Sequence, residues 1–256
     1  MKNWQHENHP LEDENPMKAH SPSVPKCGSS DKRNAEYEQN FSLKKFFDSL
    51  ITSTAPTIFD VGAHKGESIL FFKEIYKNAK IYSFEPEPSN FETLSLLAKG
   101  NDCFVYNMAI GDADERVFFY RQDISHLGGL LPINHHSTDS LGYAAKAKNE
   151  KIEVEKLKLD TFCVQNDIKH IDILKIDVQG FEVGVLKGAH NTLKHTDCVT
   201  VEISLYDFYE NNGSSLLQVE QIMTDSGFIL WDFSKISKNP KNLRTDWVEV
   251  VYKRVN

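Results

Sequence analysis

The segment 60–68 reads DVGAHKGES and places an aspartate, two glycines and a histidine directly after an apolar run. Two glycines let the backbone turn tightly and allow a ligand to approach the main chain closely. The two glycines alone are weak evidence for a ligand site, because glycines between a strand and a helix are at least as often plain turn residues. The candidate ligand contacts of this turn are Asp60, Gly62, Ala63, His64, Gly66 and Ser68.

Glu85 ends the next apolar run, 23 positions beyond Gly62, and Pro86 follows it. An acid at that place can accept hydrogen bonds from both hydroxyls of an adenosine ribose. A solvated glutamate at a strand end is the plainer alternative. Taken together with the glycine turn, Glu85 indicates a nucleoside-containing cofactor.

His64 helps to choose the cofactor. The dinucleotide fingerprint requires a second glycine at the turn, where this chain has a bulky imidazole, so NAD is disfavoured. S-adenosyl-L-methionine has no pyrophosphate, and its ammonium and carboxylate groups suit Asp60 and exposed loop amides. We therefore expect S-adenosyl-L-methionine as the cofactor.

The segment 175–182, KIDVQGFE, carries the candidate catalytic residues. Charges within an apolar strand are costly unless paired, so Lys175 and Asp177, two positions apart on one face, should have partners. Asp177 is the leading general base, held by Lys175, and its alternative is a structural ion pair with that lysine. Glu202, after the next apolar run, would orient the acceptor. Glu182 falls in a first helical turn, where the macrodipole favours a carboxylate without any catalytic duty.

The histidines and cysteines give weaker signals. His126, His135 and His136 are rival bases in a Gly/His/Ser-rich stretch, although each is more readily explained as a solvated loop histidine. The four cysteines lack C-x-x-C spacing and are expected to be free thiols. The histidines of the first forty residues lack a second cluster with zinc spacing and predict no metal site; they are His6, His9 and His20.

A mostly parallel sheet covered on both faces must position these groups, because short apolar runs alternate with helix-period segments. Ligands of such a sheet lie beyond the carboxyl ends of its strands. We expect strands at 57–63, 80–86, 103–110, 172–178, 197–204, 228–233 and 247–253, the last two forming an antiparallel pair. We expect helices at 41–51, 67–76, 89–99, 181–193 and 215–224. An insertion, residues 112–160, adds strands at 116–121 and 151–159, with a bulge near Lys156, and could form a lid or a wall for the substrate.

Length and composition set the remaining expectations. The 256 residues, 40% of them apolar, suffice for one domain at 41–256, whereas the first forty residues predict a disordered leader. The net charge of −8 gives no global attraction to nucleic acid or anionic lipid. The opening residues lack an apolar targeting segment, and no apolar run is long enough to span a bilayer, so a cytoplasmic protein is expected. Oligomeric state is left open.

The sequence resembles the FkbM family of S-adenosylmethionine-dependent methyltransferases. The matching words occur in family order at 59–66, 84–88, 109–111, 159–162, 174–182 and 185–188. The resemblance implies a Rossmann-like class I methyltransferase fold. The residue pattern adds the expected details of seven strands, an antiparallel last strand and a β-rich insertion after the third strand. The resemblance also implies cofactor contacts near the adenine from Asn107, Met108 and Ala109. His64 replaces the usual asparagine, and Gln179 replaces the usual glutamate, which disfavours a metal there.

The activity implied is O-methylation of a hydroxyl on a sugar, a glycan precursor or a related natural product. The expected partner is a small-molecule or glycan acceptor with a free hydroxyl. Two rivals stay open: a catalytically inactive protein that binds cofactor or sugar on the same fold, and, less favoured, a nicotinamide-dependent oxidoreductase. A nucleic-acid N-methyltransferase is disfavoured, because Val178-Gln179-Gly180 stands where such enzymes usually carry a Pro-Pro-aromatic element.

Overall fold

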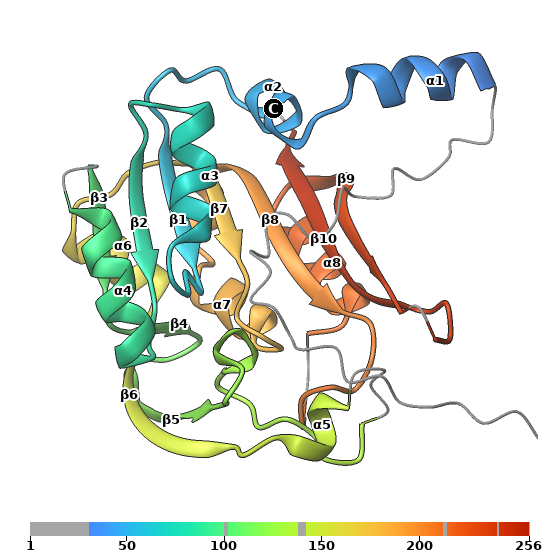
Figure 1. Cartoon of the computed structure of the whole chain (residues 1–256). Coiled ribbons are helices and arrows are strands. Elements are labelled where there is room, and N and C mark those ends of the chain that lie inside the picture. The colour runs from blue at the N-terminus through green and yellow to red at the C-terminus, as the bar shows by residue number, and fades with distance from the viewer. Residues whose placement is uncertain (1–30, 100–101, 138–141, 212–213, 240, 256) are drawn as a thin grey trace, which may run out of the picture.

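A seven-stranded sheet in the order β3-β2-β1-β7-β8-β10-β9 forms the centre of the chain (Figure 1). The computed structural model describes residues 31–99, 102–137, 142–211, 214–239 and 241–255. Strands β1, β2, β3, β7 and β8 run parallel, and β10 is antiparallel to both of its neighbours. The strand bounds are β1 Thr57–Val61, β2 Lys80–Phe84, β3 Cys103–Tyr106, β7 Ile171–Ile176, β8 Thr196–Ser204, β9 Phe228–Lys238 and β10 Thr245–Arg254. This arrangement confirms the expected Rossmann-like class I methyltransferase fold.

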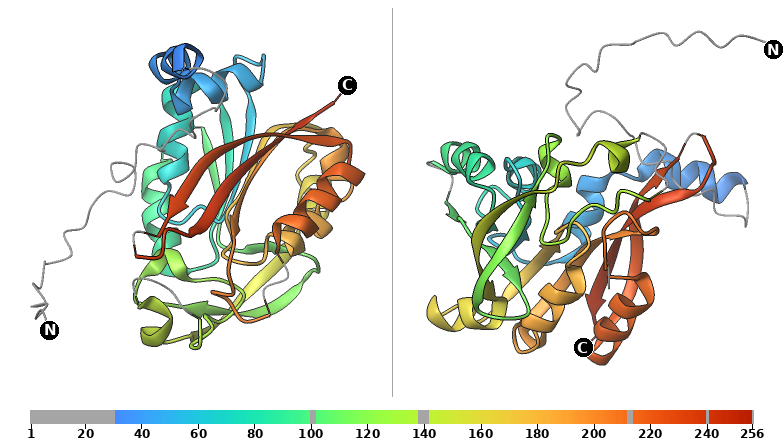
Figure 2. Two further views of the ribbon diagram at one scale, coloured as in Figure 1. Left: turned by 90° about the vertical axis from the view of Figure 1, so that its right-hand side faces the viewer. Right: turned by 90° about the horizontal axis from the view of Figure 1, so that it is seen from below.

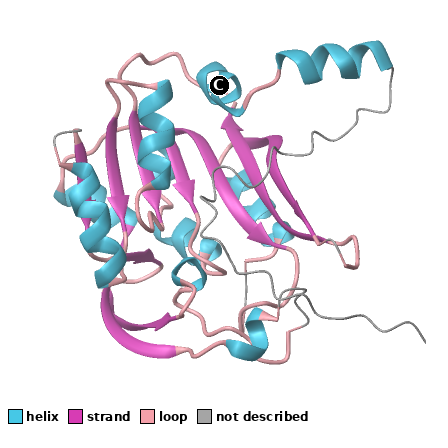
Figure 3. Cartoon of the chain, viewed as in Figure 1, coloured by secondary structure: helices cyan, strands magenta, loops and turns pink. Residues whose placement is uncertain are grey.

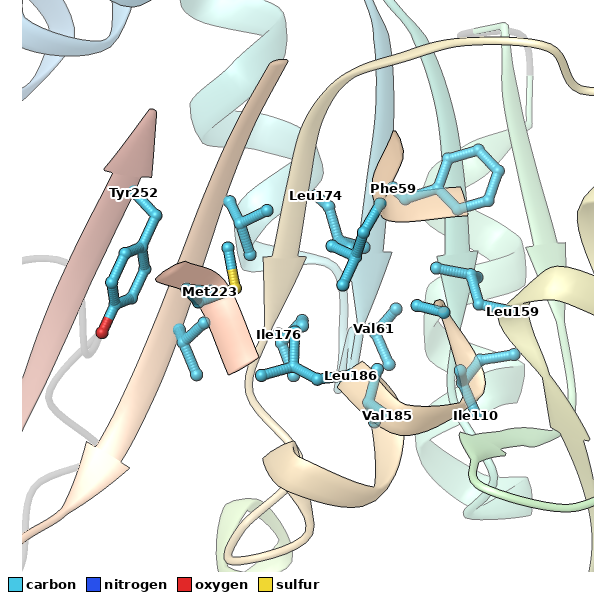
Figure 4. Packing of buried hydrophobic residues seen from close by; sticks show 14 of the residues in the cluster. Phe59, Val61, Ile110, Leu159, Leu174, Ile176, Val185, Leu186, Met223 and Tyr252 are labelled. Carbon is cyan, nitrogen blue, oxygen red and sulfur yellow. The ribbon is translucent and has the colours of Figure 1, made fainter. Parts of the chain in front are cut away.

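Helices cover both faces of the sheet (Figure 2). On one face lie α2 Leu43–Leu50, α3 Glu67–Ile75 and α4 Pro88–Ala98, and on the other α6 Leu159–Gln165, α7 Glu182–Gly188 and α8 Leu216–Asp225. Each layer buries its own apolar cluster, because successive strand residues point to opposite faces. Figure 4 shows part of the cluster of the second layer, to which the strands contribute Phe59 and Leu174 and helix α7 contributes Val185 and Leu186.

A second, three-stranded sheet lies at the carboxyl ends of the parallel strands (Figures 1 and 3). It has the order β4-β6-β5 and consists of β4 Ala109–Gly111, β5 Glu115–Arg121 and β6 Glu150–Lys158. A short 3-10 helix, η1 Ser125–Leu127, and helix α5 Tyr143–Lys146 lie between β5 and β6. The expected β-rich insertion is thus a small sheet placed beside the edge where ligands bind.

The expected strand at 103–110 is wrong as a single element. Residues 103–106 belong to the large sheet and residues 109–111 to the small one. Asn107 separates them, because its side chain donates to the main-chain oxygens of Glu85 at 2.9 Å and Pro86 at 3.1 Å. These contacts turn the chain away from the large sheet.

The expected bulge near Lys156 is absent, since β5 and β6 pair without a register shift throughout their described length. Lys156 is buried on the face of Val154, and its ammonium lies 2.7 Å from Asp112 and 2.9 Å from Glu115. Leu157 points to the opposite face and packs on the main core. Leu159 belongs to α6, a helix that the sequence pattern did not indicate.

Two further expectations change. The helix expected at 181–193 ends at Gly188, and a 3-10 helix, η2 Thr192–His195, follows it. Within the expected leader, residues 31–40 form helix α1 Asp31–Asn40, a segment without proline. Residues 1–30, with His6, His9 and His20, lie outside the described residues. Across the described part of the chain, no helix combines the length and the apolar character needed to cross a bilayer.

Candidate active site

The turn after β1 packs against the ends of both neighbouring strands. The amides of Gly62 and Ala63 donate to the Phe84 carbonyl of β2, each at 3.0 Å. A Cβ on Gly62, whose φ is +84°, would lie 1.8 Å from the Asp177 carbonyl oxygen. Only glycine combines that backbone conformation with so close an approach. The turn therefore joins β2 to the segment that follows β7.

Glu85 connects the two loops expected to hold the cofactor. Its Oε2 accepts a hydrogen bond from the His64 amide at 2.8 Å, and its Oε1 accepts one from the Glu87 amide at 2.9 Å. The side chain is buried, and burial raises the pKa of Glu85 to about 7. Each carboxylate oxygen has a further lone pair, so the group could also accept from a ligand hydroxyl.

Asp60, which is buried, forms an ion pair with the part-buried Lys175 of the adjacent strand. They are register partners in β1 and β7, and Lys175 Nζ lies 3.4 Å from Asp60 Oδ1 and 3.4 Å from Asp177 Oδ2. Burial raises the pKa of the Asp60 carboxyl. Burial alone would lower the pKa of Lys175, but Asp177 and Asp60 raise it. Lys175 has the expected partner, Asp177, and also Asp60, which the sequence did not indicate.

Gln179 links Asp177 to Glu202. Its Nε2 donates to Asp177 Oδ1 at 2.8 Å and to Glu202 Oε1 at 3.3 Å, and its Oε1 accepts from the Tyr209 hydroxyl at 2.5 Å. Burial, followed by the Asp177 charge, raises the pKa of Glu202 well above its ordinary value. Asp177 keeps about a quarter of its side chain exposed, at 27%, and so retains access to a ligand.

The insertion reaches the turn through His64. The His64 ring lies 3.0 Å from Glu67 Oε1 through Nδ1 and 2.8 Å from the Ser125 hydroxyl through Nε2. The His126 ring stands 6.3 Å from the His64 ring, so this rival base is close to the site. His135 and His136 are held elsewhere: His135 contacts Asn149, and the His136 amide donates to Asn134.

The other expected cofactor contacts take varied places. Pro86 lies half-buried after β2, and Ser68 lies half-buried in the first turn of α3. Met108 packs against the main core, and Ala109 is buried in β4. Asn107 uses its amide to fasten the end of β3 to the end of β2. The cofactor roles of these residues stay predictions.

Sequence reasoning missed three partners at this edge: Ser125, Gln179 as a bridge, and Tyr209. Ser125 and Tyr209 carry no local signal, because their contacts join segments 61 and 30 positions apart. Gln179 did carry a local signal, since a polar residue two positions after Asp177, the expected base, can lie on the same face of an extended chain. The Asp60–Lys175 ion pair could have been predicted, because the two residues occupy equivalent positions near the ends of neighbouring parallel strands.

Comparisons with known proteins identify the family of the chain. The model of the methyltransferase FkbM domain matches residues 60–230. The chain is 28% identical to the 2-O-methyltransferase NoeI of Sinorhizobium fredii over 63% of this chain and 69% of that protein. It is 26% identical to the methyltransferase sdnD of Sordaria araneosa over 76% of this chain and 83% of that protein.

A solved methyltransferase FkbM from Methylobacillus flagellatus aligns with a TM-score of 0.49 at 16% identity, over 86% of this chain. The chain spans half the length of that protein, at 50%. The family match covers about two thirds of the residues and includes the turn, Glu85, Asp177 and Glu202. The chain belongs to the methyltransferase FkbM domain family.

Proposed function

We propose that the chain is an S-adenosyl-L-methionine-dependent O-methyltransferase that acts on a hydroxyl of a sugar, a glycan precursor or a related natural product. The observation that carries the proposal is the closeness of two groups at the carboxyl edge. The glycine turn, fixed to Glu85, touches the backbone of Asp177, which presents a partly exposed carboxylate. A methyl donor and a proton acceptor can therefore lie side by side.

The residues present fit the proposed cofactor. Both carboxylate oxygens of Asp60 are buried and lack a hydrogen-bond donor among the described residues, although Lys175 lies at ionic distance. An ammonium group at the turn would supply such a donor. Glu85 retains lone pairs for ribose hydroxyls. When bound, S-adenosyl-L-methionine supplies a methyl group on a positively charged sulfur.

Asp177 would take the proton of the acceptor hydroxyl. As the acceptor oxygen takes the methyl group and the thioether of the donor leaves, the hydroxyl proton would pass to a carboxylate oxygen of Asp177. Alignment of the two reactants is worth several kcal/mol, and proton removal adds about a hundredfold or more in rate. Lys175 would keep the carboxylate in place through its ion pair.

The acceptor class rests on chemistry and on likeness. One relative is a 2-O-methyltransferase, and this likeness supports transfer to oxygen. The net charge of −8 favours a neutral or cationic acceptor over a polyanion. Exclusion of nucleic acid stays a prediction, because solved structures similar to the chain include an rRNA methylase.

Calorimetry and label transfer test the proposal. The full chain should bind S-adenosylhomocysteine, and it should transfer tritium from methyl-labelled S-adenosyl-L-methionine to one of a panel of methyl hexosides and deoxyhexosides. Asp177→Asn should keep cofactor binding and lose transfer by about a hundredfold or more. Absence of S-adenosylhomocysteine binding by well-folded protein would refute the cofactor. Full transfer by Asp177→Asn would refute the base.

A further inference from the structure

Three acids form a row across the carboxyl edge of the sheet. Glu202 and Glu249 are opposed residues of the antiparallel β8 and β10 pair, and Asp177 directly follows β7. Each of the two outer acids forms an ion pair with a lysine: Lys175 Nζ lies 3.4 Å from Asp177 Oδ2, and Lys235 Nζ lies 2.8 Å from Glu249 Oε2. The row therefore holds three carboxyl groups and two facing ammonium groups.

Glu202 is the acid left without a cation. Throughout the described ranges, no lysine, arginine or histidine nitrogen lies within 4.0 Å of its carboxyl oxygens. It stands between Asp177 and Glu249, and like charges at opposed positions of a sheet repel. A part-buried carboxyl group beside two negative charges is favoured in its protonated form: desolvation and the Asp177 charge raise the pKa of Glu202 well above its ordinary value, although Lys175 and Lys235 lower it. Among the three acids, the arrangement thus favours the protonated form most strongly at Glu202.

Gln179 stands between Glu202 and Asp177. The Tyr209 hydroxyl donates to Gln179 Oε1, which turns the amide nitrogen toward the two carboxyl groups, at 2.8 Å from Asp177 and 3.3 Å from Glu202. Gln179 adopts a φ of +56°, a backbone conformation that is uncommon for residues other than glycine, asparagine and aspartate. Backbone strain of this kind persists where the surrounding structure fixes it.

We propose that Gln179 is a positioning residue of methyl transfer, whose amide bridges the Asp177 carboxylate to a protonated Glu202 and so aims Asp177 at the acceptor hydroxyl. The inference rests on the proposed function for its catalytic meaning. The bridge itself is a property of the resting protein. In this proposal Glu202 is a protonated neighbour of Asp177, whereas the sequence indicated a role in orienting the acceptor.

Infrared difference spectroscopy on the full chain tests the bridge without an acceptor. At pH 7, the spectrum of wild type minus Glu202→Gln should contain the C=O band of a protonated carboxyl group. In Gln179→Met, which lacks the amide donor, that band should move to higher frequency, and Tyr209→Phe should move it in the same direction. Gln165→Met, on the exposed end of α6, is the matched control and should leave the band in place.

Kinetics with an acceptor found by label transfer complete the test. Gln179→Met should lower kcat about tenfold or more and leave the KM for S-adenosyl-L-methionine within about twofold. A difference spectrum without a protonated band, or a band and a kcat that Gln179→Met leaves unchanged, would overturn the inference. Failure of the wild-type chain to bind cofactor would instead count against the proposed function, while the infrared result would still decide the bridge.

Discussion

Asp60 and Lys175 occupy register-paired positions in β1 and β7, with the lysine ammonium 3.4 Å from a carboxylate oxygen that solvent cannot reach. The same ammonium lies 3.4 Å from Asp177. The part-buried Lys175 ammonium therefore contacts Asp60 on the proposed cofactor side and Asp177 on the proposed acceptor side. Because β1 and β7 are central strands, the Asp60–Lys175 pair fixes where the Asp60 and Asp177 carboxylates lie relative to each other at the carboxyl edge.

Replacement of Lys175 by methionine should destabilise the chain by about 3–5 kcal/mol, because it leaves the buried Asp60 carboxylate and the partly exposed Asp177 carboxylate without their cation. Urea unfolding at pH 7 measures the change. Asp60→Asn combined with Lys175→Met should recover part of the loss, since the double variant removes both charges of the central pair. Lys169→Met is the control, because this lysine is exposed and contacts only Asp167 as an ion pair in the described residues; it should cost about 1 kcal/mol or less. Equal stability of Lys175→Met and wild type would contradict the role of the pair.

The turn glycine Gly62 gives a sharp comparison with Gly142. Both have positive φ, +84° and +72°, so alanine is strained at each by about 1–2 kcal/mol. At Gly62 the new Cβ would meet the Asp177 carbonyl at 1.8 Å, whereas at Gly142 no atom of the described residues, apart from its own chain neighbours, lies within 4 Å. Gly62→Ala should therefore cost more than about 4 kcal/mol, and Gly142→Ala only its backbone strain. Similar urea midpoints for the two variants would show that the Gly62 contact relaxes at little cost.

Local patterns predicted most of the fold because each long strand is a short apolar run and each covering helix has a buried face. They failed where a tertiary contact decides the path. The run at 103–110 contains no glycine or proline, and the break comes from hydrogen bonds of Asn107 to the chain after β2. A bulge was expected near Lys156, but the strand stays regular there because two acids neutralise the buried Lys156 ammonium.

The candidate site was predictable in its location and less so in its contacts. Parallel strands end at one edge, so Glu85, Asp177 and Glu202 could be assigned to that edge from the apolar runs that precede them. The partners depend on strand register and on loops distant in sequence. Tyr209 reaches Gln179 only because the chain after β8 folds back over the end of β7. No pattern within either segment encodes that contact.

Glu182 makes stability depend on pH. Burial raises the pKa of this carboxyl from 4.5 to about 7, so the folded chain binds its proton more tightly than the unfolded chain does. The stabilisation is therefore complete below about pH 4.5 and is lost as the pH rises through 7, a change of about 3 kcal/mol. Glu182→Gln keeps an acceptor for the Gly180 amide and should flatten this part of the dependence, measured as urea midpoints at pH 5 and pH 8. Glu92→Gln, at an exposed position, should leave the wild-type slope, and a slope that Glu182→Gln preserves would contradict the assignment.

His64 should hold the insertion to the cofactor turn through its imidazole rather than through its backbone. Asparagine tolerates the φ of +49°, and the amide of residue 64 donates to Glu85 whatever the side chain, so His64→Asn should bind S-adenosylhomocysteine within about threefold of wild type. The variant loses the hydrogen bond to Ser125, worth about 1 kcal/mol.

Hydrogen exchange of residues 122–130, followed by mass spectrometry, should then be faster by about fivefold in His64→Asn. Ser125→Ala removes the other end of the same contact and should raise exchange equally. The double variant should add nothing further, because both changes delete one interaction. Additive effects of the two substitutions, or exchange equal to wild type in either, would mean that other contacts hold the insertion against the turn.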